Sequence, residues 1–129
     1  FISNACCKAI LKKPIIINQN VFFDYLYVDD FVQIAQWFIE NEPNHKSYNV
    51  CSGKSYDYLS IARKIVNISG HDLDISIVNS KMRKEYSGSN ELLQKEINHN
   101  FESIDDSIKS LYSWYEDNKN IIKEDQFLY

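Results

Sequence analysis

The sequence predicts an α/β fold, because two segments change from strand periodicity to helix periodicity with little chain between. Residues 21–28 place successive side chains on opposite faces and are rich in aromatic and β-branched residues, as expected for a strand. From Phe31 the apolar residues recur at helical spacing, with Ile34 on the same face. Farther along, residues 47–50 form a second short strand pattern that closes on a turn at Gly53, and another amphipathic helix follows.

The same two periodicities divide the rest of the chain into helices and strands. Asp29 or Asp30 is expected to cap the helix after the first junction. Gly70 is expected to end the next helix, and Ser103 with Asp106 gives the last helix a start similar to a capping box. The expected elements in chain order are helix 3–12, strand 15–18, strand 21–28, helix 30–41, strand 47–50, helix 56–68, strand 74–78, helix 89–96 and helix 104–120.

Charge and hydropathy exclude two classes of partner. The net charge is -4, and lysines and acids are interspersed along the chain, so we expect no nucleic-acid binding. The apolar run at residues 15–17 is far too short to cross a bilayer, and no positively charged start precedes a signal-like stretch. We therefore expect a cytoplasmic protein that does not bind a membrane.

No cluster of residues predicts a metal site or a catalytic centre in this chain. The 3 cysteines are odd in number, with two of them adjacent, which favours packed or half-exposed thiols over disulfides or metal ligands. The 3 histidines lack metal-ligand spacing and are expected in loops or at the surface. Asp24, Asp29 and Asp30 could form an acid–base pair, but structural and capping roles are the favoured interpretation.

Three short motifs stand in a fixed order along the chain. They read Tyr27-Val28-Asp29-Asp30, Tyr48-Asn49-Val50-Cys51-Ser52-Gly53 and Leu111-Tyr112-Ser113-Trp114-Tyr115. In this order and spacing the chain resembles the carboxyl-terminal part of the extended short-chain dehydrogenase/reductases that act on nucleotide sugars, the NAD-dependent epimerase/dehydratase family. The resemblance covers residues 2–118. It implies the substrate-binding portion of a Rossmann-type fold, with a small mixed sheet and helices.

The cofactor-binding half of that family has no counterpart in the sequence. It depends on a glycine-rich turn whose backbone amides meet a pyrophosphate, and the 3 glycines here are too far apart to form one. The family's catalytic Tyr-x-x-x-Lys lies upstream of the matched region, and Tyr115 with Lys119 only repeats its spacing at the end of a helix. We therefore expect residues 1–129 to be a single carboxyl-terminal substrate-binding domain or fragment of a longer chain. It should contain no catalytic residue, bound cofactor or metal.

The resemblance also implies where a nucleotide sugar would bind. In the family the strand matching residues 15–18 lies near the nucleotide base, and two arginines reach the diphosphate, which a planar guanidinium suits. The first of those positions is Phe23 here, and the second is kept as Arg83, for which a solvated basic loop is the alternative. The stretch after Arg83 lines the sugar pocket in the family. The expected substrate-binding residues are Ile17, Asn18, Phe23, Arg83, Tyr86 and Asn90.

The resemblance implies a parent protein that is an NAD(P)-dependent nucleotide-sugar epimerase, dehydratase or reductase. This part would recognise the nucleotide sugar and be inactive alone, with the missing amino-terminal Rossmann half as its partner. An isolated piece would expose a strand edge at residues 47–50 and an apolar face on helix 30–41, so a homodimer is also expected. The alternative is a non-catalytic, stand-alone module that binds a sugar nucleotide or a protein.

Overall fold

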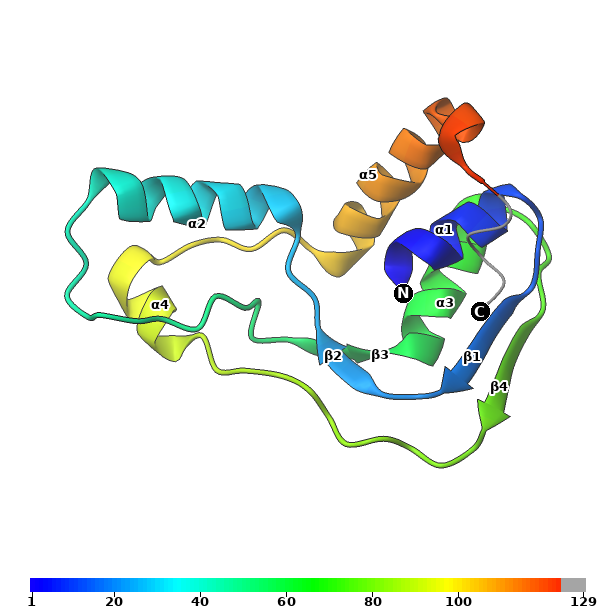
Figure 1. Cartoon of the computed structure of the whole chain (residues 1–129), viewed down its shortest axis with the longest axis horizontal. Helices are drawn as coiled ribbons and strands as arrows, with labels where there is room; N and C mark the ends of the chain where they lie inside the picture. Colours follow the sequence, from blue (N-terminus) through cyan, green and yellow to red (C-terminus); the bar gives the residue numbers. More distant parts are fainter. Residues whose placement is uncertain (124–129) are drawn as a thin grey trace.

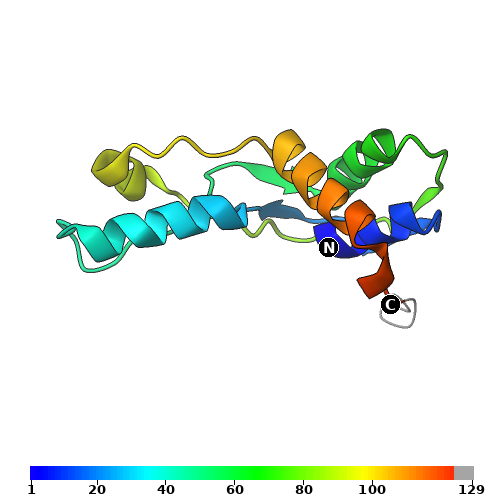
Figure 2. The ribbon, with the colours of Figure 1, turned by 90° about the horizontal axis from the view of Figure 1, so that it is seen from above.

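The computed structural model of the protein describes residues 1–123, which form helices and two small sheets. The elements are α1 (Ile2–Ile10), β1 (Ile15–Gln19), β2 (Phe22–Asp24), α2 (Val28–Glu40), β3 (Ser55–Asp57), α3 (Tyr58–Ser69), β4 (Ile75–Asn79), α4 (Glu91–Ile97), α5 (Ile104–Asp117) and a final 3₁₀ turn (Lys119–Ile121). α1, α3 and α5 lie with β1 and β4 at one end of an elongated molecule, and α2 and α4 lie at the other (Figure 1). The view from above shows the same division (Figure 2). The predicted α/β fold class is confirmed.

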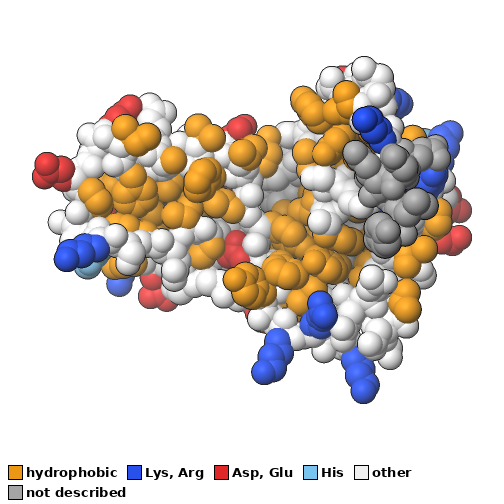
Figure 3. All heavy atoms as spheres, in the orientation of Figure 1, with side chains coloured by type: hydrophobic (Ala, Val, Ile, Leu, Met, Phe, Trp, Pro, Cys, Tyr) orange, Lys and Arg blue, Asp and Glu red, His pale blue; other side chains and the backbone are white. Residues whose placement is uncertain are grey.

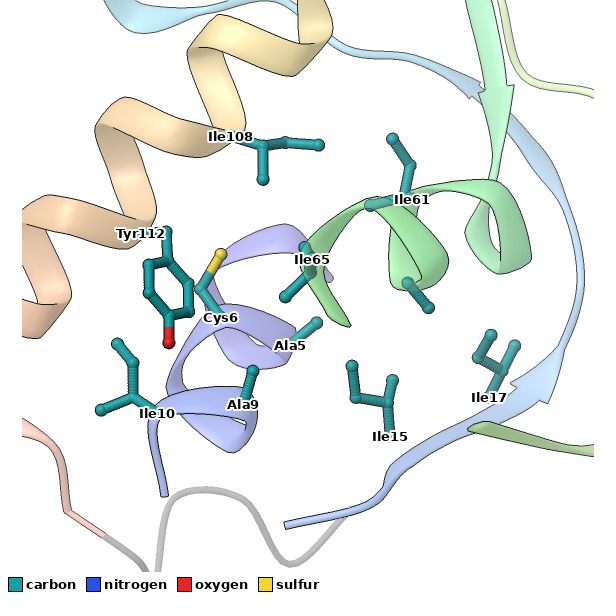
Figure 4. Packing of buried hydrophobic residues seen from close by; sticks show 11 residues of the cluster. Ala5, Cys6, Ala9, Ile10, Ile15, Ile17, Ile61, Ile65, Ile108 and Tyr112 are labelled. Carbon is teal, nitrogen blue, oxygen red and sulfur yellow. The ribbon is translucent and has the colours of Figure 1, made fainter. Parts of the chain in front are cut away.

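The hydrophobic core lies between α1, α3, α5 and β1 (Figure 4). Its centre is one face of α3, where Ile61, Ala62 and Ile65 are 0% exposed. Each fully buried isoleucine contributes on the order of 2 kcal/mol of hydrophobic free energy. This face therefore holds two other helices and a strand in fixed positions. The surrounding members of the core are Ala5, Cys6, Ala9, Ile10, Ile15, Ile17, Ile108 and Tyr112.

The cysteines follow the prediction of packed thiols. Cys6 and Cys7 are buried, Cys51 is partly buried, and all three are free. Burial raises the pKa of the Cys6 thiol to about 12, with a smaller contribution from the neighbouring Cys7. The Cys6 side chain is therefore a neutral, apolar part of the core at physiological pH.

Two short ladders make up the sheets. β1 pairs with β4 in parallel, with Ile15 opposite Ile75 and Ile17 opposite Ile77. β2 pairs with β3 in antiparallel fashion, with Phe23 opposite Tyr56. β3 is not among the predicted strands, because three residues are too few to show an alternating pattern.

The expected strand 21–28 is wrong in its second half, because its partner β3 has only three residues and the ladder ends with them. α2 begins at Val28, with Tyr27 as an N-cap residue that makes no side-chain capping bond. Asp29 and Asp30 lie in the first turn, so the prediction that one of them caps the helix is also wrong. Carboxylates are favoured in a first turn by the positive end of the helix dipole.

The expected strand at residues 47–50 is absent from the described structure. A strand is defined by backbone hydrogen bonds to a neighbour, and within residues 1–123 no segment pairs with this one. Two other predictions are confirmed: Gly70 ends α3 at a positive φ of 65°, and the Ser103 side chain caps α5 by accepting a hydrogen bond from the Asp106 N–H. Over the same residues, no helix is long and apolar enough to cross a bilayer.

The start of α3 is fixed by Asp57, whose carboxylate accepts hydrogen bonds from the backbone N–H groups of Leu59 (3.1 Å) and Ser60 (3.2 Å). The side-chain amide of Asn20 donates a third, at 2.9 Å. Partial burial acts to raise the pKa of Asp57, but hydrogen bonds from Asn20 and Ser60 outweigh it and leave that pKa below its usual value. The ionised carboxylate thus joins the strand pair to the central helix.

We predict that Asp57→Ala lowers the free energy of unfolding by about 1 kcal/mol near neutral pH. A carboxylate with a depressed pKa stabilises the folded state above its unfolded pKa of about 3.9, and this contribution disappears as the pH falls through the lower, folded pKa. The difference in free energy of unfolding between the variant and the unaltered protein should therefore shrink below about pH 4, as measured by urea denaturation. Asp72→Ala, which removes an exposed carboxylate, serves as the control. An equal loss of stability at neutral and acidic pH would contradict the role of the ionised Asp57 carboxylate as the cap of α3.

Candidate functional site

A cavity of about 600 Å³ lies between α1 and β1. One wall is a single face of α1, on which Asn4, Ala5 and Lys8 recur at helical spacing after Phe1. The opposite wall comes from β1, the first residue of α3, the end of β4 and the loop after β4. The residues of this second wall are Ile15, Ile16, Ile17, Asn18, Gln19, Tyr58, Val78, Asn79 and Arg83.

The loop after β4 brings Arg83 to this cavity. The backbone N–H of Arg83 donates a hydrogen bond of 3.0 Å to the carbonyl of Asn20, between β1 and β2. Three residues later the N–H of Tyr86 donates to the carbonyl of Phe22 at 2.9 Å, and Phe23 forms a parallel bridge with Tyr86. Residues 83–86 therefore run beside β2, which places a residue from the late loop next to β1.

A row of aromatic rings extends from the cavity along β2. The ring of Phe1 stacks on Tyr58 with centroids 4.2 Å apart, and Tyr58 stacks on Phe23 at 5.6 Å. Tyr86 follows, with its ring centroid 5.6 Å from that of Phe23. Phe1 and Tyr58 line the cavity, whereas Phe23 and Tyr86 continue the row outside it. Phe1 and Tyr58 thus give the cavity an aromatic edge.

Asp24 holds the turn that follows the second sequence motif. Its carboxylate accepts hydrogen bonds from the N–H and the hydroxyl of Ser52, both at 2.8 Å, and from the N–H of Gly53 at 2.7 Å. The side-chain amide of Asn90 donates to the carbonyl of Cys51 at 3.0 Å. Gly53 has a φ of 76°, and a Cβ there would lie 2.7 Å from the Asn90 side-chain oxygen. Glycine is therefore required by both backbone geometry and space.

The six predicted site residues fall into three places. Ile17, Asn18 and Arg83 line the cavity between α1 and β1, although they come from distant parts of the sequence. Phe23 and Tyr86 belong to the aromatic row beside it. Asn90 supports the turn at Gly53 and lines neither of the two cavities described here.

Sequence reasoning missed two polar residues of the cavity, Asn4 and Lys8. Both lie on α1, and Lys8 is only 9% exposed. Their spacing of four residues on a mostly apolar helix was the available signal, because i and i+4 positions share one face.

His99 lies in the loop between α4 and α5, in agreement with the expected loop or surface position, but its side chain is largely buried. Its side chain is 12% exposed, and its Nε2 lies 2.9 Å from a carboxylate oxygen of Asp30. The same carboxylate accepts hydrogen bonds from the N–H of Glu102. This contact ties the start of α2 to the segment before α5, in agreement with the structural role predicted for Asp30. Among residues 1–123, no group of three or more metal-ligating side chains is close enough to hold an ion.

A second cavity, of about 450 Å³, lies between the start of α2 and α5. Its lining is mainly apolar and includes Leu26, Val28, Ile104 and Leu111. Tyr25 also lines it, and the hydroxyl of this residue is buried without a hydrogen-bond partner among the described residues. Burial raises the pKa of Tyr25, so its hydroxyl stays protonated at physiological pH.

Comparison with solved structures shows the same fold within larger proteins. RMD from Pseudomonas aeruginosa, complexed with NADPH, is 20% identical, with a TM-score of 0.79 over 91% of this chain and 42% of that one. UDP-glucose 4-epimerase from Thermotoga maritima, with UDP-glucose, is 15% identical, with a TM-score of 0.79 over 92% of this chain and 40% of that one. WbmF from Bordetella bronchiseptica, in complex with NAD+, is 20% identical, with a TM-score of 0.77 over 99% of this chain and 39% of that one.

The expected resemblance to NAD-dependent epimerases and dehydratases is therefore confirmed at the level of the fold. The chain spans about 40% of the length of these structures. No family model and no curated protein matches the sequence. The fold of this chain is thus shared with part of each of these larger proteins.

We predict that Asp24→Ala releases the turn at Ser52 and Gly53 without unfolding the core. The two backbone N–H groups lose a charged acceptor, and a loss of roughly 1.4 kcal/mol accelerates amide exchange about tenfold. Hydrogen exchange measured by NMR should show this change at Ser52 and Gly53 and leave Ile61 unaffected. Asp29→Ala, at an exposed acid nearby, is the matched control. Unchanged exchange at the turn would show that Asp24 does not hold it.

Proposed function

We propose that this chain is the substrate-binding part of an NAD(P)-dependent nucleotide-sugar epimerase, dehydratase or reductase, and that the cavity between α1 and β1 receives the nucleotide sugar. The observation that carries the proposal is the meeting of Ile17, Asn18 and Arg83 at one cavity. The resemblance had assigned these three residues to the same ligand. The Thermotoga maritima structure with this fold contains UDP-glucose and the Pseudomonas aeruginosa structure contains NADPH, which supports the proposed classes of substrate and cofactor.

The division of labour follows from the residues that the chain contains. NAD(P), when bound by another part of the protein, supplies hydride transfer at a sugar carbon. Asn18 and the exposed face of β1 bind and orient the base, and Arg83 donates hydrogen bonds to the diphosphate. The aromatic row at Phe23 and Tyr58 excludes water from one side of the ligand. The chain alone is inactive, because recognition is its only contribution.

A partner segment is proposed to cover α2 and the second cavity. Val28, Phe31, Val32 and Ile39 on α2 are between 52% and 85% exposed, and hydrophobic side chains gather in this region of the surface (Figure 3). The buried hydroxyl of Tyr25, unpartnered among the described residues, also needs an acceptor or donor from elsewhere. A dinucleotide-binding half of the same protein would cover the apolar residues of α2 and supply a hydrogen-bond partner to the Tyr25 hydroxyl. Self-association of the isolated chain through this face remains a prediction.

The alternative function is a binding module without catalysis. Phe23 favours it, because this residue stands where the resembled family has an arginine for the diphosphate. The two functions differ in one observable property: both bind a nucleotide sugar, and only the first turns it over with NAD(P).

We predict that Arg83→Ala in the full-length protein raises KM for the nucleotide sugar about tenfold or more, because a charge-assisted hydrogen bond to a phosphate contributes roughly 1.5–3 kcal/mol. Steady-state kinetics provide the measurement, and the dissociation constant replaces KM if the protein binds without turnover. Lys84→Ala, the neighbouring exposed cation, is the control and should change neither value by more than about twofold. An unchanged KM for Arg83→Ala would remove Arg83 from the site.

A further inference from the structure

We propose that Lys8 is an anion-binding residue, which together with Arg83 holds the diphosphate of the ligand in the cavity between α1 and β1. This inference rests on the proposed function, since it adds a second cation to the diphosphate site proposed for Arg83. It assigns a binding role to a residue that neither the sequence motifs nor the resemblance had indicated.

The first argument is the environment of the Lys8 side chain. Lys8 is 9% exposed and lines the cavity. Among residues 1–123, its ammonium group has no hydrogen-bond or ion-pair partner. The other lysines in described ion pairs, such as Lys64 with Asp105 at 2.7 Å, are far more exposed. The side chain of Lys8 is thus largely buried, and its ammonium lacks an opposite charge among the described residues, so an anion in the cavity would provide one.

The second argument is the charge of the cavity. Its lining contains the cations Lys8 and Arg83, together with side-chain amides such as those of Asn4 and Asn18. None of the described residues that line it is an aspartate or glutamate, although the chain has 18 acids and a net charge of -4. Two cations and several hydrogen-bond donors, without a competing carboxylate, favour a ligand that carries two negative charges close together. A diphosphate has this property.

The third argument is the position of Phe23. Its ring is stacked on Tyr58 and lies outside the cavity, so β2 contributes no charge to the ligand. Lys8 enters the cavity from α1, a different wall, and restores a second positive charge there. Lysine acts as a compact point charge, whereas Arg83 provides a planar fork, so the two residues can bind different oxygens of one diphosphate.

The test compares a nucleoside diphosphate with its nucleoside on the full-length protein. Of UDP and GDP, the one that binds more tightly is titrated calorimetrically, alongside uridine or guanosine. Lys8→Met keeps the length and apolar stem of the side chain. We expect it to weaken nucleoside diphosphate binding about tenfold to hundredfold and nucleoside binding by less than about twofold. Lys8→Arg should restore most of the affinity. Lys109→Met, at an exposed lysine on α5, makes the same change in net charge and should have no effect.

Each outcome decides the proposal. Equal weakening of nucleoside and nucleoside diphosphate, or unchanged binding of both, would overturn the role of Lys8 and leave the proposed function intact. If neither UDP nor GDP binds the unaltered protein, the proposed function fails, and the inference fails with it. If Lys8→Met does not fold, the charged subsite is tested instead by competition between inorganic pyrophosphate and the nucleotide on the unaltered protein. Pyrophosphate that displaces the bound nucleotide supports the charged subsite, and pyrophosphate that does not compete contradicts it.

Discussion

Burial of one face of α3 is the constraint on which the rest of the structure depends. Ile61, Ala62 and Ile65 have no exposed surface, and α1, α5 and β1 all pack against the same cluster. Because this packing fixes α1 and β1 relative to each other, it also fixes the two walls of the larger cavity. Cys6 and Ala9 on α1 point into the core. Lys8, on another face of the same helix, therefore lines the cavity. The shape of this cavity is thus a consequence of how the core is packed.

The other end of the molecule is held mainly by polar contacts. Asp30 connects α2 to the segment before α5 through His99, and Asp24 holds the turn at Ser52 and Gly53. Asn44 reaches α4 through the carboxylate of Glu96, at 3.1 Å from its backbone N–H. These contacts order the chain without covering the exposed apolar residues of α2. A surface of this kind is typical of an element that packs against another part of a larger protein.

The sequence predicted the elements whose residues have a strong local pattern. The helix with Ile61 and Ile65 on one face, its end at Gly70 and the Ser103 cap of α5 are all confirmed, because periodicity and capping are local properties. The errors concern features that depend on distant partners. Residues 47–50 have a strand-like composition but no neighbour to pair with, and residues 25–27 leave the ladder where β3 ends.

The candidate site was predictable only in part. The resemblance indicated Arg83 and the strand at Ile17, and the structure places both at one cavity. Lys8 could not be found in this way, because its importance comes from burial and from the absence of a partner within residues 1–123. The burial of His99 against Asp30 was missed for a similar reason, since the two residues are separated by most of the chain. Tertiary contacts of polar side chains leave little trace in local sequence.

The most direct test of the account is a crystal structure of the full-length protein with a bound nucleotide sugar, either UDP-glucose or GDP-fucose. The account predicts that the nucleotide diphosphate lies in the cavity between α1 and β1, within hydrogen-bonding distance of Arg83. A ligand seated in the cavity between α2 and α5, with the larger cavity filled by side chains or by another segment of the protein, would contradict it.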